Sequence, residues 1–241
     1  MFDHVTIRVS DCAASERFYE TVLPAVGLEE PRRAEPYAEW GDFSIAQADD
    51  VKPVTRNLHL AFAAPSRGQV DEFWQAGTEA GYRDDGAPGL RPQYGDDYYG
   101  GFLLDPDGNS IEAVRLASTG ARRTIDHLWL RVRDITASKR FYELIAPYSG
   151  FRLEADTPDR AQFNGAAGSF SVVAGEPSEN VHVAFPALDN ATVDEFHRSA
   201  MEAGYRNEGL PGERAIYHAG YYGAFVLDPD GNNIEVVNHN R

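Results

Sequence analysis

At 241 residues the chain has room for one or two domains, and its composition is that of an ordinary globular protein. Its formal net charge of −16 disfavours nucleic acid and anionic membrane as partners, because no basic surface is expected to hold them. The single cysteine, Cys12, precludes an intrachain disulfide bond, and no apolar run is long enough to span a bilayer. The N-terminus has no signal-like pattern, so these features together predict a cytoplasmic protein.

The first predicted elements are a strand and a helix. Apolar and polar residues alternate over residues 4–9, which is the period of a half-buried strand. Ser10 or Asp11 can then cap a helix whose apolar residues recur every four positions, and Gly27 ends that helix. The chain therefore begins with a strand that one helix covers.

The pattern continues with further strands and a second helix. In chain order we predict two or three short strands, an alternating strand, a helix and two final strands, at residues 39–46, 57–62, 67–80, 98–104 and 110–114. A tight turn over Asp105–Asn109 joins the last two strands, because proline presets one turn position and glycine takes the positive φ.

The whole pattern then recurs 123 residues later. Over residues 3–20, 11 of 18 positions are identical to those of the second copy, and over residues 98–114 the number is 13 of 17. Such a repeat predicts two domains of one fold. We place them at residues 1–116 and 124–241, joined by a short linker of small and polar residues at 117–123.

Two histidines and one glutamate recur with this repeat. The two sets are His4, His59 and Glu112 in the first half and His127, His182 and Glu235 in the second. Two imidazoles and one carboxylate are ligands of divalent metals, and three protein ligands leave coordination positions open for substrate or water. The repeat thus predicts two metal sites, and the alternative of histidines satisfied on a polar sheet face weakens when the complete set occurs twice.

Alternation indicates where these side chains point. In the first strand Val5, Ile7 and Val9 take the face that a helix covers, so His4 lies on the opposite face. The same reasoning places all six candidate ligands away from the helices. It leaves the pairing open: ligands could combine within one half, or the fourth strand–helix unit could close on the first.

The chain resembles the vicinal oxygen chelate superfamily, also called the glyoxalase / bleomycin-resistance / dioxygenase superfamily. The matching segments are Asp3-His4 with its strand, Arg17–Tyr19, Asn57–His59 and Tyr98–Glu112, each of them with a counterpart in the second half. This resemblance implies an α+β fold of four βαβββ units, which form two tandem domains whose curved sheets enclose clefts. It also implies that the six histidines and glutamates sit at metal-ligand positions.

The sequence matches the individual subfamilies of this superfamily less completely than it matches the superfamily as a whole. Extradiol dioxygenases of this family use an acid/base histidine and a tyrosine at positions where this chain has Gly168 and Phe225, with His218 and Tyr217 as the nearest substitutes. Glyoxalase I enzymes use a further glutamate ligand, which this chain lacks at the corresponding strand. Fosfomycin-resistance transferases carry a threonine two residues after the first histidine, as Thr6 does here.

Other residues are candidates for contacts with a substrate. The candidate catalytic residues are His218, Tyr217 and Thr6, and the candidate substrate-binding residues are Arg8, Arg131, Tyr98, Tyr99, Tyr221, Tyr222 and Trp129. The two arginines share the face of the first histidines and could hold an anionic group, although a cross-strand ion pair explains them equally well. Core packing is an equal alternative for the four tyrosines.

The sequence and the resemblance together favour a metal-dependent enzyme acting on a small molecule. A dioxygenase-like oxidoreductase with Fe(II) at a 2-His-1-Glu site is the first hypothesis. The alternatives are a lyase, isomerase or thiol transferase using Zn, Mn or Ni, and a non-catalytic protein that sequesters a drug or metabolite. A homodimer is compatible with the sequence.

Overall fold

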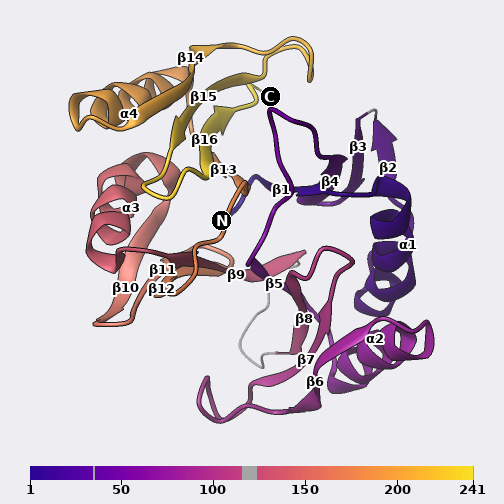
Figure 1. Ribbon diagram of the computed structural model, residues 1–241. Helices are drawn as coiled ribbons and strands as arrows, with labels where there is room; N and C mark the ends of the chain where they lie inside the picture. The colour runs from indigo at the N-terminus through magenta and orange to yellow at the C-terminus, as the bar shows by residue number, and fades with distance from the viewer. Residues whose placement is uncertain (35, 116–123, 241) are drawn as a thin grey trace. The chain divides into compact units, whose positions relative to one another are not determined.

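A computed structural model describes residues 1–34, 36–115 and 124–240 of the chain (Figure 1). The chain divides into two compact units. Unit 1 comprises Met1–Val5 with Leu130–Arg241, and unit 2 comprises Thr6–Trp129. Strands β1 (His4–Val9) and β9 (Ile125–Val132) each contribute residues to both units.

Unit 2 holds most of β1, the first residues of β9, and the elements between them. These are α1 (Cys12–Val22), the 3₁₀ helix η1 (Leu23–Val26), β2 (Arg32–Ala34), β3 (Tyr37–Trp40), β4 (Phe43–Gln47), β5 (His59–Ala63), α2 (Arg67–Glu79), β6 (Arg83–Leu90), β7 (Tyr99–Leu104) and β8 (Ser110–Arg115). Its strands are ordered β1-β4-β3-β2 and β9-β5-β8-β7-β6.

Unit 1 repeats this organisation. Besides its parts of β1 and β9 it contains α3 (Ile135–Ser149), β10 (Phe151–Thr157), β11 (Arg160–Gly165), β12 (Ser169–Ala174), β13 (His182–Pro186), α4 (Asn190–Glu202), β14 (Arg206–Glu213), β15 (Tyr222–Leu227) and β16 (Asn233–Asn238). Its strands are ordered β9-β12-β11-β10 and β1-β13-β16-β15-β14. The strand–helix–strands pattern therefore occurs four times, which confirms the predicted α+β fold with tandem domains.

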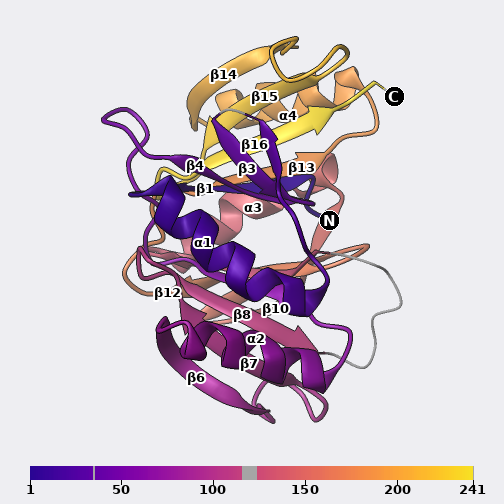
Figure 2. The same cartoon turned by 90° about the vertical axis from the view of Figure 1, so that its right-hand side faces the viewer.

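Each helix covers one face of its own strands, as the apolar patterns predict. Figure 2 shows α2 lying along β6, β7 and β8. The alternate residues Val5, Ile7 and Val9 of β1 are fully buried. The Asp11 side chain caps α1 by accepting a hydrogen bond from the backbone amide of Ala14.

Strands β6 and β14 were not predicted from the sequence. Their sequences, RDDGAPGL and RNEGLPGE, contain glycine and proline and do not alternate, so they lack the usual signs of a strand. Both lie at the edge of a sheet, where a strand has only one partner, and both pairings are interrupted by register shifts. Hydrogen bonding to β7 and β15 therefore holds β6 and β14 in the strand conformation, although their own sequences have little preference for it.

The predicted domain limits, residues 1–116 and 124–241, remain a prediction. The predicted linker at residues 117–123 lies outside the described residues. Among the helices that the structure describes, none is long and apolar enough to cross a membrane.

Candidate metal centres

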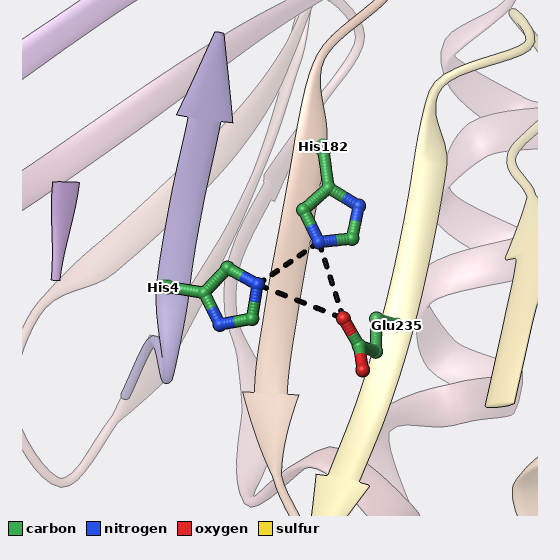
Figure 3. A group of neighbouring side chains, drawn as sticks. All are labelled: His4, His182 and Glu235. Carbon is green, nitrogen blue, oxygen red and sulfur yellow. Dashed lines mark hydrogen bonds and ion pairs between the residues drawn. The ribbon is translucent and has the colours of Figure 1, made fainter. Parts of the chain in front are cut away.

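The six predicted ligands form two groups, but each group mixes the halves of the sequence. In unit 1 the group is His4, His182 and Glu235, drawn in Figure 3, and in unit 2 it is His59, Glu112 and His127. We call these triad 1 and triad 2. Of the two pairings that the sequence left open, the structure has the one in which the first strand–helix unit combines with the fourth. The exchange arises because β1 pairs with β13 and β9 pairs with β5.

In triad 1 the three side chains converge from β1, β13 and β16 (Figure 3). The Nε2 atoms of His4 and His182 are 3.0 Å apart. The Glu235 Oε2 atom lies 3.1 Å from His182 Nε2 and 3.6 Å from His4 Nε2. The histidine side chains are 28% and 20% exposed, whereas that of Glu235 is 1% exposed, so the triad is reachable from solvent through its histidines.

Triad 2 has the same arrangement in a more buried setting. The Nε2 atoms of His59 and His127 are 3.3 Å apart, and Glu112 Oε2 lies 3.1 Å from the first and 3.4 Å from the second. None of the three side chains is more than 8% exposed. Triad 2 is thus the more enclosed of the two.

Both triads fit a divalent metal ion. Two ligands bound at about 2.1 Å, with bonds meeting at about 90–109°, have their ligand atoms about 3.0–3.4 Å apart. The distances in both triads lie within a few tenths of an ångström of this range. In addition, Glu112 and Glu235 are buried carboxylates, which are costly without a cationic partner. Two imidazoles, one carboxylate and open positions match the ligand set of non-haem Fe(II) oxygenases and of catalytic zinc sites.

The register of three strands builds triad 2. Strand β5 runs parallel to β8 and antiparallel to β9, so Ala61 lies opposite Glu112 on one side and His127 on the other. His59 is two residues from Ala61 and shares its face. The small side chain of Ala61 leaves the space above it to the three ligands. Ala184 occupies the same place in unit 1, opposite Glu235.

The Asp105–Asn109 turn fixes the start of β5. The side-chain oxygen of Asn109 accepts a hydrogen bond from the amide of Leu58, the residue before His59, and its side-chain nitrogen donates to the carbonyl of Thr55. Asn57 adopts a positive φ of 58°, which asparagine tolerates better than most residues. The predicted turn therefore also fixes the position of the candidate ligand His59 at the start of β5.

Tyrosine and glycine residues hold the glutamates. Tyr98 donates a hydrogen bond of 2.7 Å to Glu112 Oε1, and Tyr221 donates one of 2.7 Å to Glu235 Oε1. A Cβ atom at Gly100 would lie 2.2 Å from Glu112 Oε1, so only glycine leaves room for the carboxylate. Each tyrosine therefore holds one oxygen of the candidate metal ligand while the other oxygen faces the histidines, and the predicted contact of Tyr98 and Tyr221 with substrate stays a prediction.

The charges of triad 2 are strongly coupled. Burial raises the pKa of Glu112, but hydrogen bonds from His127 and His59 outweigh this and bring it to about 2. Burial lowers the pKa of His127, but the carboxylates of Asp126 and Glu112 outweigh this and bring it to about 9. The Asp126 Oδ1 atom is 3.0 Å from His127 Nδ1, so the Nε2 atom faces the other ligands. At neutral pH, triad 2 without a cation therefore holds a proton on His127.

The surroundings of the two triads differ. Beside triad 2 the Trp129 ring lies 5.1 Å from that of His59, and Tyr94 packs edge-on against Trp129. Trp129 thus lies beside triad 2, and its substrate-binding role stays a prediction. Beside triad 1, Asp3 Oδ1 lies 2.8 Å from His4 Nδ1, and His239 approaches the other oxygen of Asp3.

Two predicted substrate-binding residues, Tyr99 and Tyr222, form hydrogen bonds to helices. The hydroxyl of Tyr99 donates to Asp71 on α2, and that of Tyr222 donates to Asp194 on α4. Successive strand residues point to opposite faces, so the neighbours of Tyr98 and Tyr221 face the helices. The predicted substrate-binding role of Tyr99 and Tyr222 stays a prediction, and their hydroxyl contacts to α2 and α4 do not support it.

Three further predicted residues, Thr6, Arg8 and Arg131, contact neighbouring residues. The hydroxyl of Thr6 hydrogen-bonds to Ser44, and Arg8 donates to the carbonyl of Gln47. The stem of Arg131 packs beside Gly175. Their catalytic and substrate-binding roles stay predictions.

His218 and Tyr217 lie in the loop between β14 and β15. The Tyr217 ring packs against Tyr221 at 4.8 Å, and His218 Nε2 is 2.8 Å from His239 Nδ1. Tyr217 is therefore connected to triad 1 through Tyr221, and His218 is connected to it through His239 and Asp3. The link through His239 and Asp3 was missed, because nothing in the sequence spacing indicates that residues 3 and 239 meet.

A family model matches both halves of this chain, and known proteins resemble part or all of it. The family model described as Glyoxalase/Bleomycin resistance protein/Dioxygenase superfamily matches residues 1–113 and 124–236. The uncharacterized protein YqjT of Bacillus subtilis strain 168 is 32% identical over 125 residues, which are 46% of this chain and 95% of that protein. The crystal structure of glyoxalase I from Zea mays has a TM-score of 0.72 at 20% identity and covers 99% of this chain and 92% of its own. At that identity the likeness shows a common fold.

Proposed function

Because the chain belongs to the Glyoxalase/Bleomycin resistance protein/Dioxygenase superfamily, we propose that it is an enzyme that binds a divalent metal at each triad and acts on a small molecule. Within this class we favour a dioxygenase-like oxidoreductase that uses Fe(II). When bound, such an ion polarises substrate oxygens, and iron can also bring O₂ to the substrate.

The observation that carries the proposal is the convergence of His4, His182 and Glu235 to within 3.0–3.6 Å. Three protein ligands suit a reactive site, since the ion keeps open positions. Among the described residues, the metal-ligating groups contain two histidines and one glutamate and no fourth acidic ligand. This supports the 2-His-1-carboxylate set of Fe(II) oxygenases over the four-ligand set that the family resemblance associates with glyoxalase I.

The protein's own residues prepare the site before any substrate arrives. Tyr221 holds one oxygen of Glu235, so the other oxygen stays directed at the two histidines. Asp3 holds Nδ1 of His4, which leaves Nε2 directed at the same point. These contacts orient two of the three ligand atoms in advance, and the partly exposed histidines leave an approach for a small molecule.

Metal content and oxygen uptake test the proposal. The protein would be stripped with a chelator and reloaded anaerobically with Fe(II), Zn, Mn or Ni, and each form would be assayed for oxygen uptake with a panel of catechols and related small molecules. We expect two equivalents of metal and activity with Fe(II) alone. The equivalent variants His182→Ala and His59→Ala should each lose one equivalent.

His197→Gln is the matched control, because His197 lies on α4 and bonds to Asn207 rather than to a triad. Activity with Zn, Mn or Ni but without oxygen uptake would replace the dioxygenase with a lyase, isomerase or thiol transferase. A protein that binds no stoichiometric metal, and whose ligand binding survives His59→Ala and His182→Ala, would overturn the enzyme proposal in favour of sequestration.

A further inference from the structure

Aromatic rings surround triad 2 within unit 2. We call the following four residues the aromatic cluster: Tyr94, Tyr98, Phe102 and Trp129. The Trp129 ring lies 5.1 Å from that of His59 and 6.1 Å from that of His127. Phe102 lies 6.0 Å from His59, and Tyr98 lies 6.2 Å from His127. Each histidine of triad 2 therefore has two rings of the cluster beside it.

Trp129 occupies the solvent side of this cluster. It lies directly opposite His59 in the antiparallel pairing of β5 and β9, and it shares a face with His127, which is two residues away on β9. Tyr94 packs edge-on against Trp129 at 5.5 Å and lies 5.1 Å from Tyr98. The Trp129 side chain is partly exposed, whereas the side chains of His59 and His127 are only 8% and 7% exposed. The indole ring therefore covers the two histidines.

Three members of the cluster recur in the other copy of the sequence, and the indole does not. Tyr94, Tyr98 and Phe102 have the same residue types as their counterparts, which are Tyr217, Tyr221 and Phe225. The counterpart of Trp129 is Thr6, a much smaller residue that is buried and hydrogen-bonds to Ser44. The two copies thus differ at the one cluster position that covers the histidines.

This difference accounts for the unequal exposure of the two triads. The histidine side chains of triad 1 are 28% and 20% exposed, against 7% and 8% in triad 2. Two other substitutions between the copies, His218 for Gly95 and Asn233 for Ser110, put the larger side chain in unit 1. They would make triad 1 the more buried of the two, which is the opposite of what is observed. Trp129 in place of threonine acts in the observed direction.

Covering the histidines changes what can reach a metal ion. Three protein ligands leave coordination positions open, and the apolar shell around a metal site controls the access of solvent to it. At triad 1 the exposed histidines leave these positions open to water and small molecules. At triad 2 a molecule has to displace the indole from its contacts with Tyr94 and His59, which costs the energy of two ring contacts.

We infer that Trp129 caps triad 2, so that triad 1 is the centre at which a small molecule meets the metal and triad 2 keeps its metal enclosed. Trp129 thus determines which of the two centres takes part in the reaction. The statement about metals rests on the proposed function. The cap itself is a property of the protein without metal, so it is tested separately.

NMR of the metal-free protein with a neutral, soluble nitroxide tests the cap, because the nitroxide broadens the ring protons of exposed side chains. In the wild type, the histidines of triad 1 should be broadened and those of triad 2 should be protected. Trp129→Thr introduces the residue found at the counterpart position, and the histidines of triad 2 should then lose their protection. Trp74→Thr is the matched control, because Trp74 lies on α2 and bonds to Asp84, and it should leave the protection unchanged.

Manganese(II) and water test the consequence for the metal centres. His59→Ala keeps triad 1 complete, and His182→Ala keeps triad 2 complete. Manganese(II) in the first protein should accelerate the relaxation of water protons, and in the second it should lose most of this effect. A chelator should remove the ion from triad 2 about 10-fold more slowly or less readily still, because the indole must first leave its contacts. Adding Trp129→Thr to His182→Ala should restore both the water relaxation and the fast removal.

The results separate the cap from the metal-enzyme proposal. Equal broadening of all four histidines in the wild type would overturn the cap. If no metal binds but Trp129→Thr removes the protection of triad 2, the metal-enzyme proposal falls and the cap stands. If manganese(II) binds at both triads and relaxes water equally, the metal centres stand and the cap falls. Should Trp129→Thr fail to fold, the wild-type spectrum and the two single-centre proteins still decide.

Discussion

Removing the proton from His127 should destabilise the metal-free protein at alkaline pH. Asp126 and Glu112 raise the pKa of His127 to about 9 against the opposing effect of burial. Because the pKa in the folded state is raised, this histidine contributes its full stabilisation below its unfolded pKa of about 6.5 and loses it as the pH rises through about 9. The effect is in the opposite direction to that of a carboxylate with a lowered pKa.

The size of the effect follows from the shift in pKa. Raising a pKa from 6.5 to about 9, at about 1.4 kcal/mol per pH unit, corresponds to about 3 kcal/mol. The His127 side chain is only 7% exposed, so solvent screens little of it. Against His127→Gln, the wild type should therefore lose about 3 kcal/mol more unfolding free energy between pH 6 and pH 10.

Urea unfolding in the presence of a chelator measures this difference. All three tryptophans of the chain, Trp40, Trp74 and Trp129, belong to unit 2, so their fluorescence reports on the unit that contains triad 2. Subtracting the variant's curve from the wild type's removes the contribution of the other titrating groups. A difference that stays constant from pH 6 to pH 10 would refute the account of a protonated His127 in the folded protein.

Three further predictions concern the metal centres. Tyr98→Phe removes the hydrogen bond to Glu112 and should weaken metal binding at triad 2 about 10-fold or more with an unchanged circular dichroism spectrum; unchanged affinity in a metal titration would contradict the role given to the hydroxyl. Gly100→Ala and Gly223→Ala place a methyl group 2.2 and 2.6 Å from a glutamate oxygen, and each should lower the stoichiometry from two metal equivalents to one; two equivalents in either variant would show that the carboxylate can move aside. Metal binding at triad 2 should release about one proton from His127 below pH 9, so calorimetry in buffers of different ionisation enthalpy should detect it, and buffer-independent heats would argue against it.

The sequence was sufficient for most of the helices and strands, with β6 and β14 as exceptions, and for the residues of the two candidate metal centres. Alternation in β1 and β5 indicated which face each histidine takes, because only one face of these strands is apolar. The exchange of His4 and His127 was not predictable, because each half has the same residues at the same spacing and both pairings complete a triad. Only the strand neighbours β1–β13 and β5–β9 decide between them.

The residues that shape the site were harder to find. Nothing in the sequence marks the alanine at position 61 as part of a site. Its importance arises from its register opposite Glu112 and His127. Tyr98 and Tyr99 are neighbours of the same type, and only the direction of the side chain separates the one that holds Glu112 from the one that bonds to α2. Both features depend on long-range pairing, which local patterns do not specify.

The exchange of histidines makes the two sequence copies interdependent. A polypeptide ending at residue 115 would keep His59 and Glu112 but would lack His127, the third candidate ligand of triad 2. The complementary fragment would keep His182 and Glu235 but would lack His4. If either half were lost, neither triad would keep all three of its ligands. Genetic loss of one half would therefore abolish both metal centres at once, instead of reducing the number of bound metal ions from two to one.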